Sequence, residues 1–450
     1  MNLGAIRTAL WPRSGRARLL ALACLLIGAL YLGKGIYRGL TFTRGDYYFT
    51  MPGEYARQLN PALWTSPDLQ QAIGFNHGTY LYGPTQYLTL FPVVFLDSYE
   101  SIASALLVVY PLVLGAAWYC LWRTLAIGEE RRPAMPALLF AAMFAFLPLT
   151  QALIQREFEV VAFLLLAGAC LLLVRGREVA SGALLAGLTW FKYWPIILLG
   201  AFIVHRRLRG LAAFAVTSAA ILLAAHLAFG LEHFVIGKTL GTVGGLVRPL
   251  GGGEVLYPVI PEGAGKSDFC RQWIWGRGTA ADVRWALCSV EYSVPAFSAK
   301  AAFFALIAGT ATLFLWGAYR LESGLPTRSA AKWATVWELS ILTIVGVSFV
   351  HAHYYYLIAF LLPLTALLFS YSARPQSARR TKLAAWAVTY VLLNAFIVPT
   401  SWLSAITHRD AWALYLDSGA CLLGTLMLLG LVLWEFTRLT VHAPQPLAGV

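Results

Sequence analysis

The chain has 450 residues, of which 59% are hydrophobic and 12% charged, and its formal net charge is +13. Soluble domains usually carry about 25% charged residues, so this composition excludes an ordinary soluble protein. Most lysines and arginines stand in short segments between apolar runs, where they set membrane topology, so the positive charge does not predict a nucleic-acid partner. The composition instead predicts an all-α polytopic membrane protein, with residues 1–450 forming a single integral membrane domain.

Ten apolar segments are predicted to cross the bilayer as full spans, in a bundle of about 10–12 helices. They are 19–40, 101–125, 134–150, 158–174, 211–230, 297–319, 333–350, 355–371, 382–400 and 418–437. If the N-terminus is cytoplasmic, most arginine-rich segments between these spans also fall on the cytoplasmic side. The charge pattern therefore predicts a multi-pass protein with both termini in the cytoplasm.

Residues 41–100 are predicted to form the first extracytoplasmic loop, which includes interfacial helices. Two acids, Asp46 and Glu54, stand near its start. Asp46 would act as a general base that takes a proton from an acceptor hydroxyl; the alternative is an exposed loop acid or a helix cap. The apolar segment 79–96 contains two prolines, so it is expected to dip into the outer interface, where tyrosines such as Tyr82 suit the headgroup level.

Gln155 and Arg156 directly precede the predicted span 158–174. Ionisable groups at the edge of the hydrocarbon region need a partner or a polar cavity, which makes these residues candidates for substrate binding. The alternative is that Arg156 pairs with Glu157 or extends its charge to the interface.

The segment 180–204 has arginines on both flanks, so it is predicted to enter and leave the membrane on the same side. A proline after an aromatic cluster ends a helix, and Pro195 stands in such a place. Two arms of about 12 residues, roughly 18 Å each, would put Lys192 at the turn and within the ~30 Å core. Such a lysine indicates a functional site, and its ammonium suits a lipid phosphate. The alternatives are one continuous helix, or an interfacial lysine anchored by Trp190 and Trp194.

A long extracytoplasmic loop is predicted over 231–296, rich in glycine at first and in tryptophan later, which is typical of a segment leading to an interfacial cap. Cys270 and Cys288 both lie in this loop. An extracytoplasmic position would allow them to form a disulfide, and the alternative is two free thiols.

His351 and His353 lie where the span 333–350 ends and the next begins. Two histidines at positions i and i+2 point apart on a helix, and no clustered acids accompany them, so no metal site is predicted. Contact with a phosphate or a sugar hydroxyl is expected; the alternative is a pair of interfacial histidines. The chain has no P-loop, GxSxG or dinucleotide-binding motif, so no nucleotide and no cofactor is expected.

Several stretches resemble glycosyltransferase family 87, the bacterial polyprenyl-phosphate-mannose-dependent α-mannosyltransferases of the GT-C class. The motifs that carry the resemblance are Asp46-Tyr47-Tyr48 with Glu54-Tyr55-Ala56, Tyr80-Leu81-Tyr82-Gly83-Pro84, Gln155 with 182–187, Lys192-Tyr193-Trp194-Pro195 with Arg206-Arg207, and 348–353. The run from Gln155 to Arg207 is the most specific. Two departures are Gly83, where the family usually has a proline, and Ala352, where a histidine pair is common; His353 is the preferred match.

The resemblance implies a GT-C-like bundle in a bacterial inner membrane, with an extracytoplasmic active site. It implies inverting transfer of a sugar, foremost mannose, from a polyprenyl-phosphate donor to a hydroxyl of a glycolipid or glycan acceptor. By this resemblance Asp46 is the base, and Lys192 with Gln155 or Arg156 lies near the donor phosphate. A monophosphate leaving group needs no metal if cations neutralise its charge. The alternative function is a flippase for lipid-linked sugars that catalyses no transfer.

Overall fold

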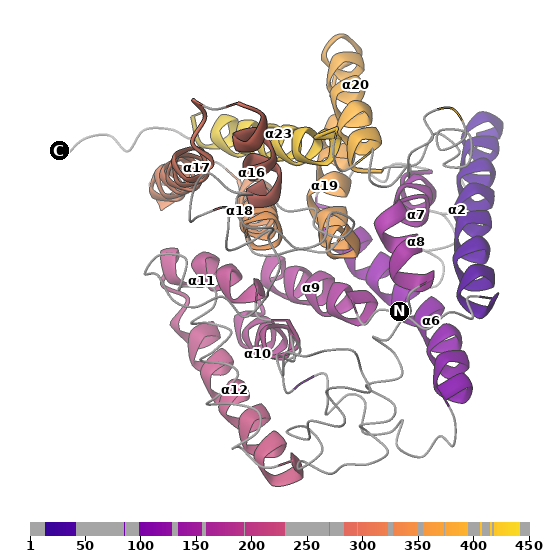
Figure 1. Ribbon diagram of the computed structural model, residues 1–450, viewed down its shortest axis with the longest axis horizontal. Helices are drawn as coiled ribbons and strands as arrows, with labels where there is room; N and C mark the ends of the chain where they lie inside the picture. Colours follow the sequence, from indigo (N-terminus) through magenta and orange to yellow (C-terminus); the bar gives the residue numbers. More distant parts are fainter. Residues whose placement is uncertain are drawn as a thin grey trace.

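The computed structural model describes residues 14–41, 85, 99–127, 134–154, 159–192, 194–229, 270, 283–294, 296–322, 327–349, 354–372, 374–394, 406, 415 and 418–441. The described residues form helices joined by turns, with no β-strand among them (Figure 1). Asp46, Glu54, Tyr82, Gln155, Arg156, His351 and His353 lie outside these ranges.

Every longer described range is mainly helical. The helices are α2 (Gly15–Thr41), α6 (Tyr99–Leu125), α7 (Met135–Phe144), α8 (Leu147–Ile154), α9 (Glu159–Val174), α10 (Glu178–Thr189), η3 (Trp194–Leu199), α11 (Gly200–Val204), α12 (Leu208–Phe229), α16 (Val283–Ser293), α17 (Ala299–Glu322), α18 (Arg328–Ser348), η5 (Tyr354–Phe360), α19 (Leu361–Ser372), α20 (Gln376–Leu393) and α23 (Ala420–Val441).

Six helices within the described ranges are long and apolar enough to cross a membrane: α2, α6, α12, α17, α18 and α23. They coincide with six of the ten predicted spans, and the protein is an all-α polytopic membrane protein. The other four segments differ from straight, full-length spans. The segment 134–150 is the bent pair α7–α8, 158–174 and 355–371 are shorter apolar helices, and 382–400 is α20, which ends at Leu393.

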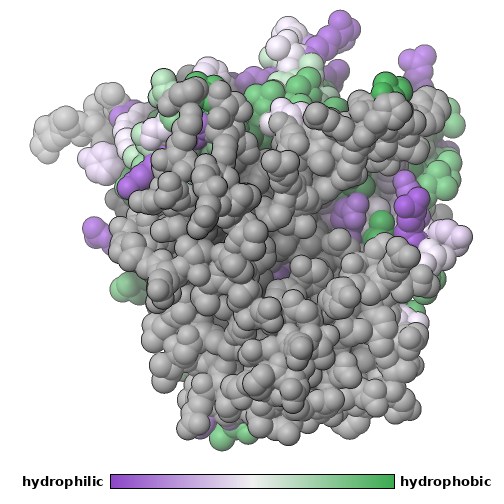
Figure 2. Space-filling model, viewed as in Figure 1, coloured by the Kyte–Doolittle hydropathy of each residue, from purple (hydrophilic) through white to green (hydrophobic). Residues whose placement is uncertain are grey.

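The outer helices expose apolar side chains, as helices in contact with lipid do. On α2, Leu19 and Leu30 are more than half exposed, and on α12 the same holds for Val216 and Leu227. Figure 2 shows green apolar surface along the edge of the molecule where α2 lies and beneath the tip of α20, with purple polar side chains at that tip. An apolar surface of this extent is unfavourable in water, and in a membrane it contacts lipid chains.

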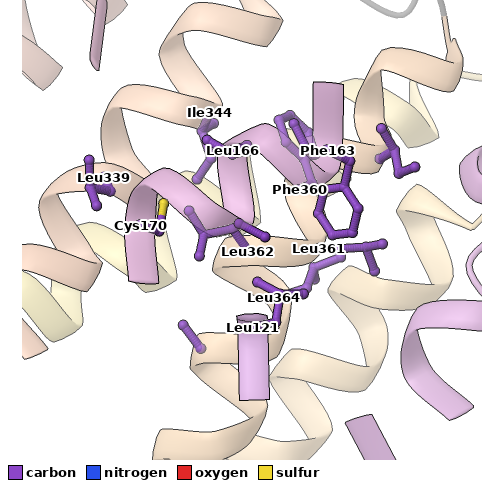
Figure 3. Close-up of a cluster of buried hydrophobic side chains, with 14 of the residues drawn as sticks. Leu121, Phe163, Leu166, Cys170, Leu339, Ile344, Phe360, Leu361, Leu362 and Leu364 are labelled. Carbon is purple, nitrogen blue, oxygen red and sulfur yellow. The ribbon is translucent and has the colours of Figure 1, made fainter. Parts of the chain in front are cut away.

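The centre of the bundle is an apolar core built mainly from α6, α9, α18, η5 and α19. Figure 3 shows Phe163 and Leu166 of α9 beside Ile344 of α18, and Phe360 beside them at the end of η5. Phe163, Leu166 and Ile344 are at most 1% exposed, and Phe360 is fully buried. This core fixes the position of α9 and η5, the elements that carry Glu159 and Tyr356.

The segment after α9 forms the predicted hairpin. Helix α10 ends at Thr189, and the amides of Phe191 and Lys192 both donate to the carbonyl of Leu188, which closes the turn. The chain then returns as the 3₁₀ helix η3 and the short helix α11. The predicted turn at Lys192 is confirmed, and one continuous helix over 180–204 is excluded. The second arm differs from the expected α-helix because most of it is a 3₁₀ helix.

Helix α10 packs between α9 and α12. The hydroxyl of Ser181 donates to the carbonyl of Ala169 at 2.8 Å, which joins α10 to α9. On the other side, Gly182 packs so closely on Gly210 that a Cβ atom at position 182 would collide with the Gly210 carbonyl. Small residues allow this approach of two helix backbones, as is common in membrane bundles.

Candidate active site at the tip of the hairpin

Lys192 is buried, with 4% of its surface exposed, although lysine is among the residues most costly to bury. Its ammonium forms an ion pair with the Glu159 carboxylate. It also donates a hydrogen bond of 3.1 Å to the Tyr356 hydroxyl and lies 4.6 Å from the centroid of the Tyr356 ring. Three segments far apart in the sequence therefore meet at one buried charge.

The lengths of the elements explain this meeting. Glu159 is the first residue of α9, which has 16 residues and is therefore about 24 Å long. After the turn at 175–177 the chain runs back along α9 as α10, so the tip of the hairpin returns to the level of the first turn of α9. Lys192 thus lies at the end of α9 and α10 opposite the arginines of that turn, beside the start of η5.

A small pocket opens at this cluster. Its lining residues are Glu159, Ala162, Phe163, Leu166, Lys192, Trp194, Tyr356, Ile358 and Ala359. The cavity volume is about 10 Å³, which is room for roughly one water-sized group. Glu159 Oε1 faces the Lys192 ammonium, whereas Glu159 Oε2 is buried with no hydrogen-bond partner within the described part of the chain. The pocket therefore combines a neutralised cation, an unsatisfied carboxylate oxygen and aromatic rings.

The ion pair holds both side chains in place because neither charge is stable alone at this depth. Removing one partner from a buried pair leaves an uncompensated charge, at a cost of about 3–5 kcal/mol. Lys192 and Glu159 should therefore be considered as one unit in any mutational experiment.

A residue between α2 and α6 reaches the same site. The amide of Thr85 donates a 3.1 Å hydrogen bond to the carbonyl of Trp190, in the turn of the hairpin. Thr85 directly follows the tyrosine–proline motif that ends at Pro84. This bond connects the predicted interfacial segment 79–96 to the turn that carries Lys192.

A second buried pair lies at the other end of the hairpin. His205, which follows α11, places Nε2 2.6 Å from Glu338 Oε1 in the middle of α18. Glu338 is fully buried, and its Oε2 has no hydrogen-bond partner within the described ranges. Together with Gly346, whose missing side chain leaves room for Trp194 and Ile197, this pair attaches the returning arm of the hairpin to α18.

Of the residues predicted to form the site, the structure describes Lys192 and the two loop cysteines. Cys270 and Cys288 are joined by a disulfide with a Cα–Cα distance of 5.5 Å. It fastens residue 270 to α16, and the buried carboxylate of Glu291 at the end of α16 accepts a 2.7 Å hydrogen bond from the first amide of α17. The cysteines thus belong to a structural cap away from the pocket's lining residues. Within the described residues, no three His, Cys, Asp or Glu side chains gather as a metal site would require.

Glu159 and Tyr356 were not predicted as site residues. The signal for Glu159 was present, because an intramembrane lysine needs an anionic partner and Glu159 is an acid on the adjoining apolar span. Tyr356 stands in a run of three tyrosines after His353, and its role follows from tertiary packing alone.

Residues 80–246 match the model of glycosyltransferase family 87. The matched region begins at the tyrosine–proline motif and contains α9, the hairpin with Lys192 and most of the buried cluster. No curated protein matches the chain. The match confirms the resemblance predicted from the motifs: residues 80–246 of this chain are similar to glycosyltransferase family 87.

Proposed function

We propose that this protein transfers a sugar, foremost mannose, from a polyprenyl phosphate to a hydroxyl of a glycolipid or glycan, with inversion at the anomeric carbon. The family match indicates a glycosyltransferase. The observation that carries the finer proposal is the buried ammonium of Lys192, held at the tip of the hairpin inside the matched region. A cation at this depth suits an anionic group that enters from the lipid phase.

The lipid character of the donor is supported by the surface of the bundle. The exposed side chains of α2 and α12 are apolar, so a long isoprenoid tail finds the same environment there as other lipid chains. A polyprenyl phosphate needs no nucleotide-binding fold, and membrane helices are sufficient to hold it.

Asp46 is the proposed general base. It takes the proton of the acceptor hydroxyl while that oxygen attacks the anomeric carbon from the face opposite the phosphate. The bond between the anomeric carbon and the phosphate oxygen breaks, and its electron pair leaves with the polyprenyl phosphate. Lys192, with Gln155 or Arg156, stabilises the negative charge that develops on the leaving group.

The remaining predicted residues are proposed to bind substrate around this reaction. His353, or its neighbour His351, contacts the phosphate or a sugar hydroxyl, and Glu54 and Tyr82 also contact substrate. The hydrogen bond from Thr85 to Trp190 supports a position of Tyr82 near the hairpin, because only two residues separate Tyr82 from Thr85.

The site is proposed to face the extracytoplasmic side of a bacterial inner membrane, with both termini in the cytoplasm. Support comes from the basic turns at 175–177 and 205–209, which lie at the base of the hairpin, whereas Lys192 lies at its tip. Clusters of arginine remain on the cytoplasmic side.

The replacement Asp46→Asn tests the reaction. Loss of a general base is expected to lower turnover by about 10²- to 10⁴-fold without changing the thermal stability. The measurement is transfer from radiolabelled polyprenyl-phosphate mannose to a lipid acceptor by the purified protein in nanodiscs. Asp68→Asn, which changes another acid of the same predicted loop, is the matched control and should transfer at the wild-type rate.

Wild-type turnover in the Asp46→Asn protein would reject Asp46 as the base. Movement of the labelled lipid across the bilayer with no transferred sugar would reject the transferase and indicate the flippase alternative.

A further inference from the structure

Glu159 has a carboxylate oxygen that the described fold does not satisfy. The side chain is 4% exposed, Oε1 pairs with Lys192, and Oε2 is buried without a hydrogen-bond partner among the described residues. A buried carboxylate oxygen left without a donor is unfavourable, so native proteins normally supply one from the protein, a water molecule or a ligand. Oε2 belongs to a side chain that lines the pocket, so the donor can come from a group in that pocket.

The size and charge of the pocket restrict this donor. A volume of about 10 Å³ admits roughly one water-sized group, which excludes a whole phosphate. The Glu159 carboxylate repels an anion from the pocket itself, so the donor phosphate proposed to lie near Lys192 stays outside the pocket. A neutral hydroxyl group therefore fits, whether it belongs to a water molecule or to a ligand. Two aromatic side chains, Trp194 and Phe163, are among the lining residues.

We propose that Glu159 is a substrate-binding residue whose Oε2 accepts a hydrogen bond from one hydroxyl of the donor's sugar. The inference rests on the proposed function, in which the donor phosphate lies near Lys192. The sugar is bonded directly to that phosphate, so it lies within a few ångströms of the pocket. The two side chains of the ion pair then contact different parts of the donor: the lysine lies beside the phosphate, and the glutamate binds a hydroxyl of the sugar.

The interaction gives a prediction about specificity. Replacing the contacted hydroxyl by fluorine keeps its approximate size but removes the donated hydrogen, and the fluorine faces the carboxylate unfavourably. A hydrogen bond to a charged group corresponds to about a 10- to 100-fold difference in affinity. One fluorinated position of the sugar should therefore weaken donor binding by this factor, and the other positions should not.

The experiment measures donor binding rather than turnover, because fluorine also changes the reactivity of the anomeric carbon. The full-length protein in nanodiscs is titrated with polyprenyl-phosphate mannose and with its 2-, 3-, 4- and 6-deoxyfluoro analogues. For each protein, the dissociation constant of each fluorinated analogue is divided by that of the unmodified donor, and these ratios are compared between proteins. Glu159→Gln should reduce the ratio at the sensitive position at least about fivefold, because a neutral acceptor makes a weaker bond.

Glu338→Gln is the matched control. It removes a second buried glutamate, paired with His205 at the other end of the hairpin, so it reproduces the general cost of losing a buried carboxylate. Its ratios should equal those of the wild type at every position. If Glu159→Gln fails to fold, Glu159→Asp keeps the charge but withdraws the oxygen by one methylene, and the same loss of discrimination is expected.

Unchanged ratios in the Glu159 variants would overturn the inference and assign a water molecule to the pocket. A Glu159-dependent penalty seen with deoxyfluoro acceptors but not donors would also overturn it, in favour of an acceptor subsite. A wild-type protein that binds and transfers no polyprenyl-phosphate sugar would instead reject the proposed function itself.

Discussion

Lys192 and Glu159 stabilise one another in a region that excludes water. The attraction between them compensates for the loss of hydration only while both charges are present. The Tyr356 hydroxyl accepts a further hydrogen bond from the ammonium and thereby joins η5 to the pair. The same residues are therefore expected to affect both stability and donor binding, and the two effects can be separated by comparing single and double replacements.

The replacement Lys192→Met is expected to lower the free energy of unfolding by about 3–5 kcal/mol, because Glu159 is left charged and unpaired. The double replacement Lys192→Met/Glu159→Gln removes both charges and should recover most of the lost stability. Neither protein should bind the donor like the wild type, since both lack the ammonium. Thermal unfolding in detergent and donor titration provide the two measurements. A double variant no more stable than the single one would contradict the dependence of each charge on the other.

At the level of single elements, the hairpin and the bent pair α7–α8 depend on close contacts with other helices. The two helices of the bent pair meet at 56°. Pro148 has no amide hydrogen, so the regular helical bonding cannot continue through the bend. Asn394 compensates by accepting from the amide of Leu147 at 2.6 Å and donating to the carbonyl of Ala145 at 2.9 Å. The Tyr390 hydroxyl donates to the carbonyl of Ala142 at 2.8 Å.

The contact of α10 with α12 can be tested with two glycines of the same helix. A Cβ atom at Gly182 would collide with the Gly210 carbonyl, whereas a Cβ atom at Gly187 meets nothing within 4 Å. Gly182→Val should therefore displace the hairpin and reduce both stability and transfer. Gly187→Ala should be neutral, or more stable by up to about 1 kcal/mol through helix propensity. Melting temperature and transfer rate of the two variants provide the comparison, and equal behaviour would disprove the tight packing at Gly182.

The bend depends on Asn394 in the same way. Asn394→Ala leaves the Leu147 amide and the Ala145 carbonyl without their partners, at a cost of about 1–3 kcal/mol for each buried group. We expect a clearly lower melting temperature in detergent. Asn394 directly follows α20, and the exposed Gln376 at the start of α20 provides the control, since Gln376→Ala removes no such bond. A stability equal to that of the control would show that water replaces Asn394 at the bend.

At the scale of the whole molecule, the helical class, six long spans and the turn at Lys192 follow from the sequence, because apolar runs, arginine-rich flanks and Pro195 are local signals. The bend of 134–150 was not predicted, since it is completed by Asn394 from a distant part of the chain. The ion pair was missed for a similar reason: the partner of Lys192 is decided by the length of α9 and α10. The catalytic role of Asp46 stays a prediction, because that residue lies outside the described ranges.

The predicted topology can be tested with single cysteines placed in two segments. Ser377→Cys lies in the first turn of α20, in the basic segment 374–382 that is predicted to be cytoplasmic, and Ser66→Cys lies in the predicted first outer loop. A membrane-impermeant maleimide should label position 66 in intact cells and position 377 only after the membrane is permeabilised. The wild-type chain, with its own cysteines, measures the background. The reverse pattern would place the Lys192 pocket on the cytoplasmic side.

The order of Glu159, Lys192 and Tyr356 along the chain has a consequence for biogenesis. Glu159 and Lys192 belong to consecutive segments, so they can neutralise one another soon after the hairpin leaves the ribosome, well before Tyr356 has been synthesised. Lateral release of the hairpin from the translocon then requires α9 to accompany it, since either charge alone is poorly tolerated in lipid. The nascent chain is therefore expected to enter the bilayer as a preassembled α9–hairpin unit, onto which α18 and η5 dock afterwards.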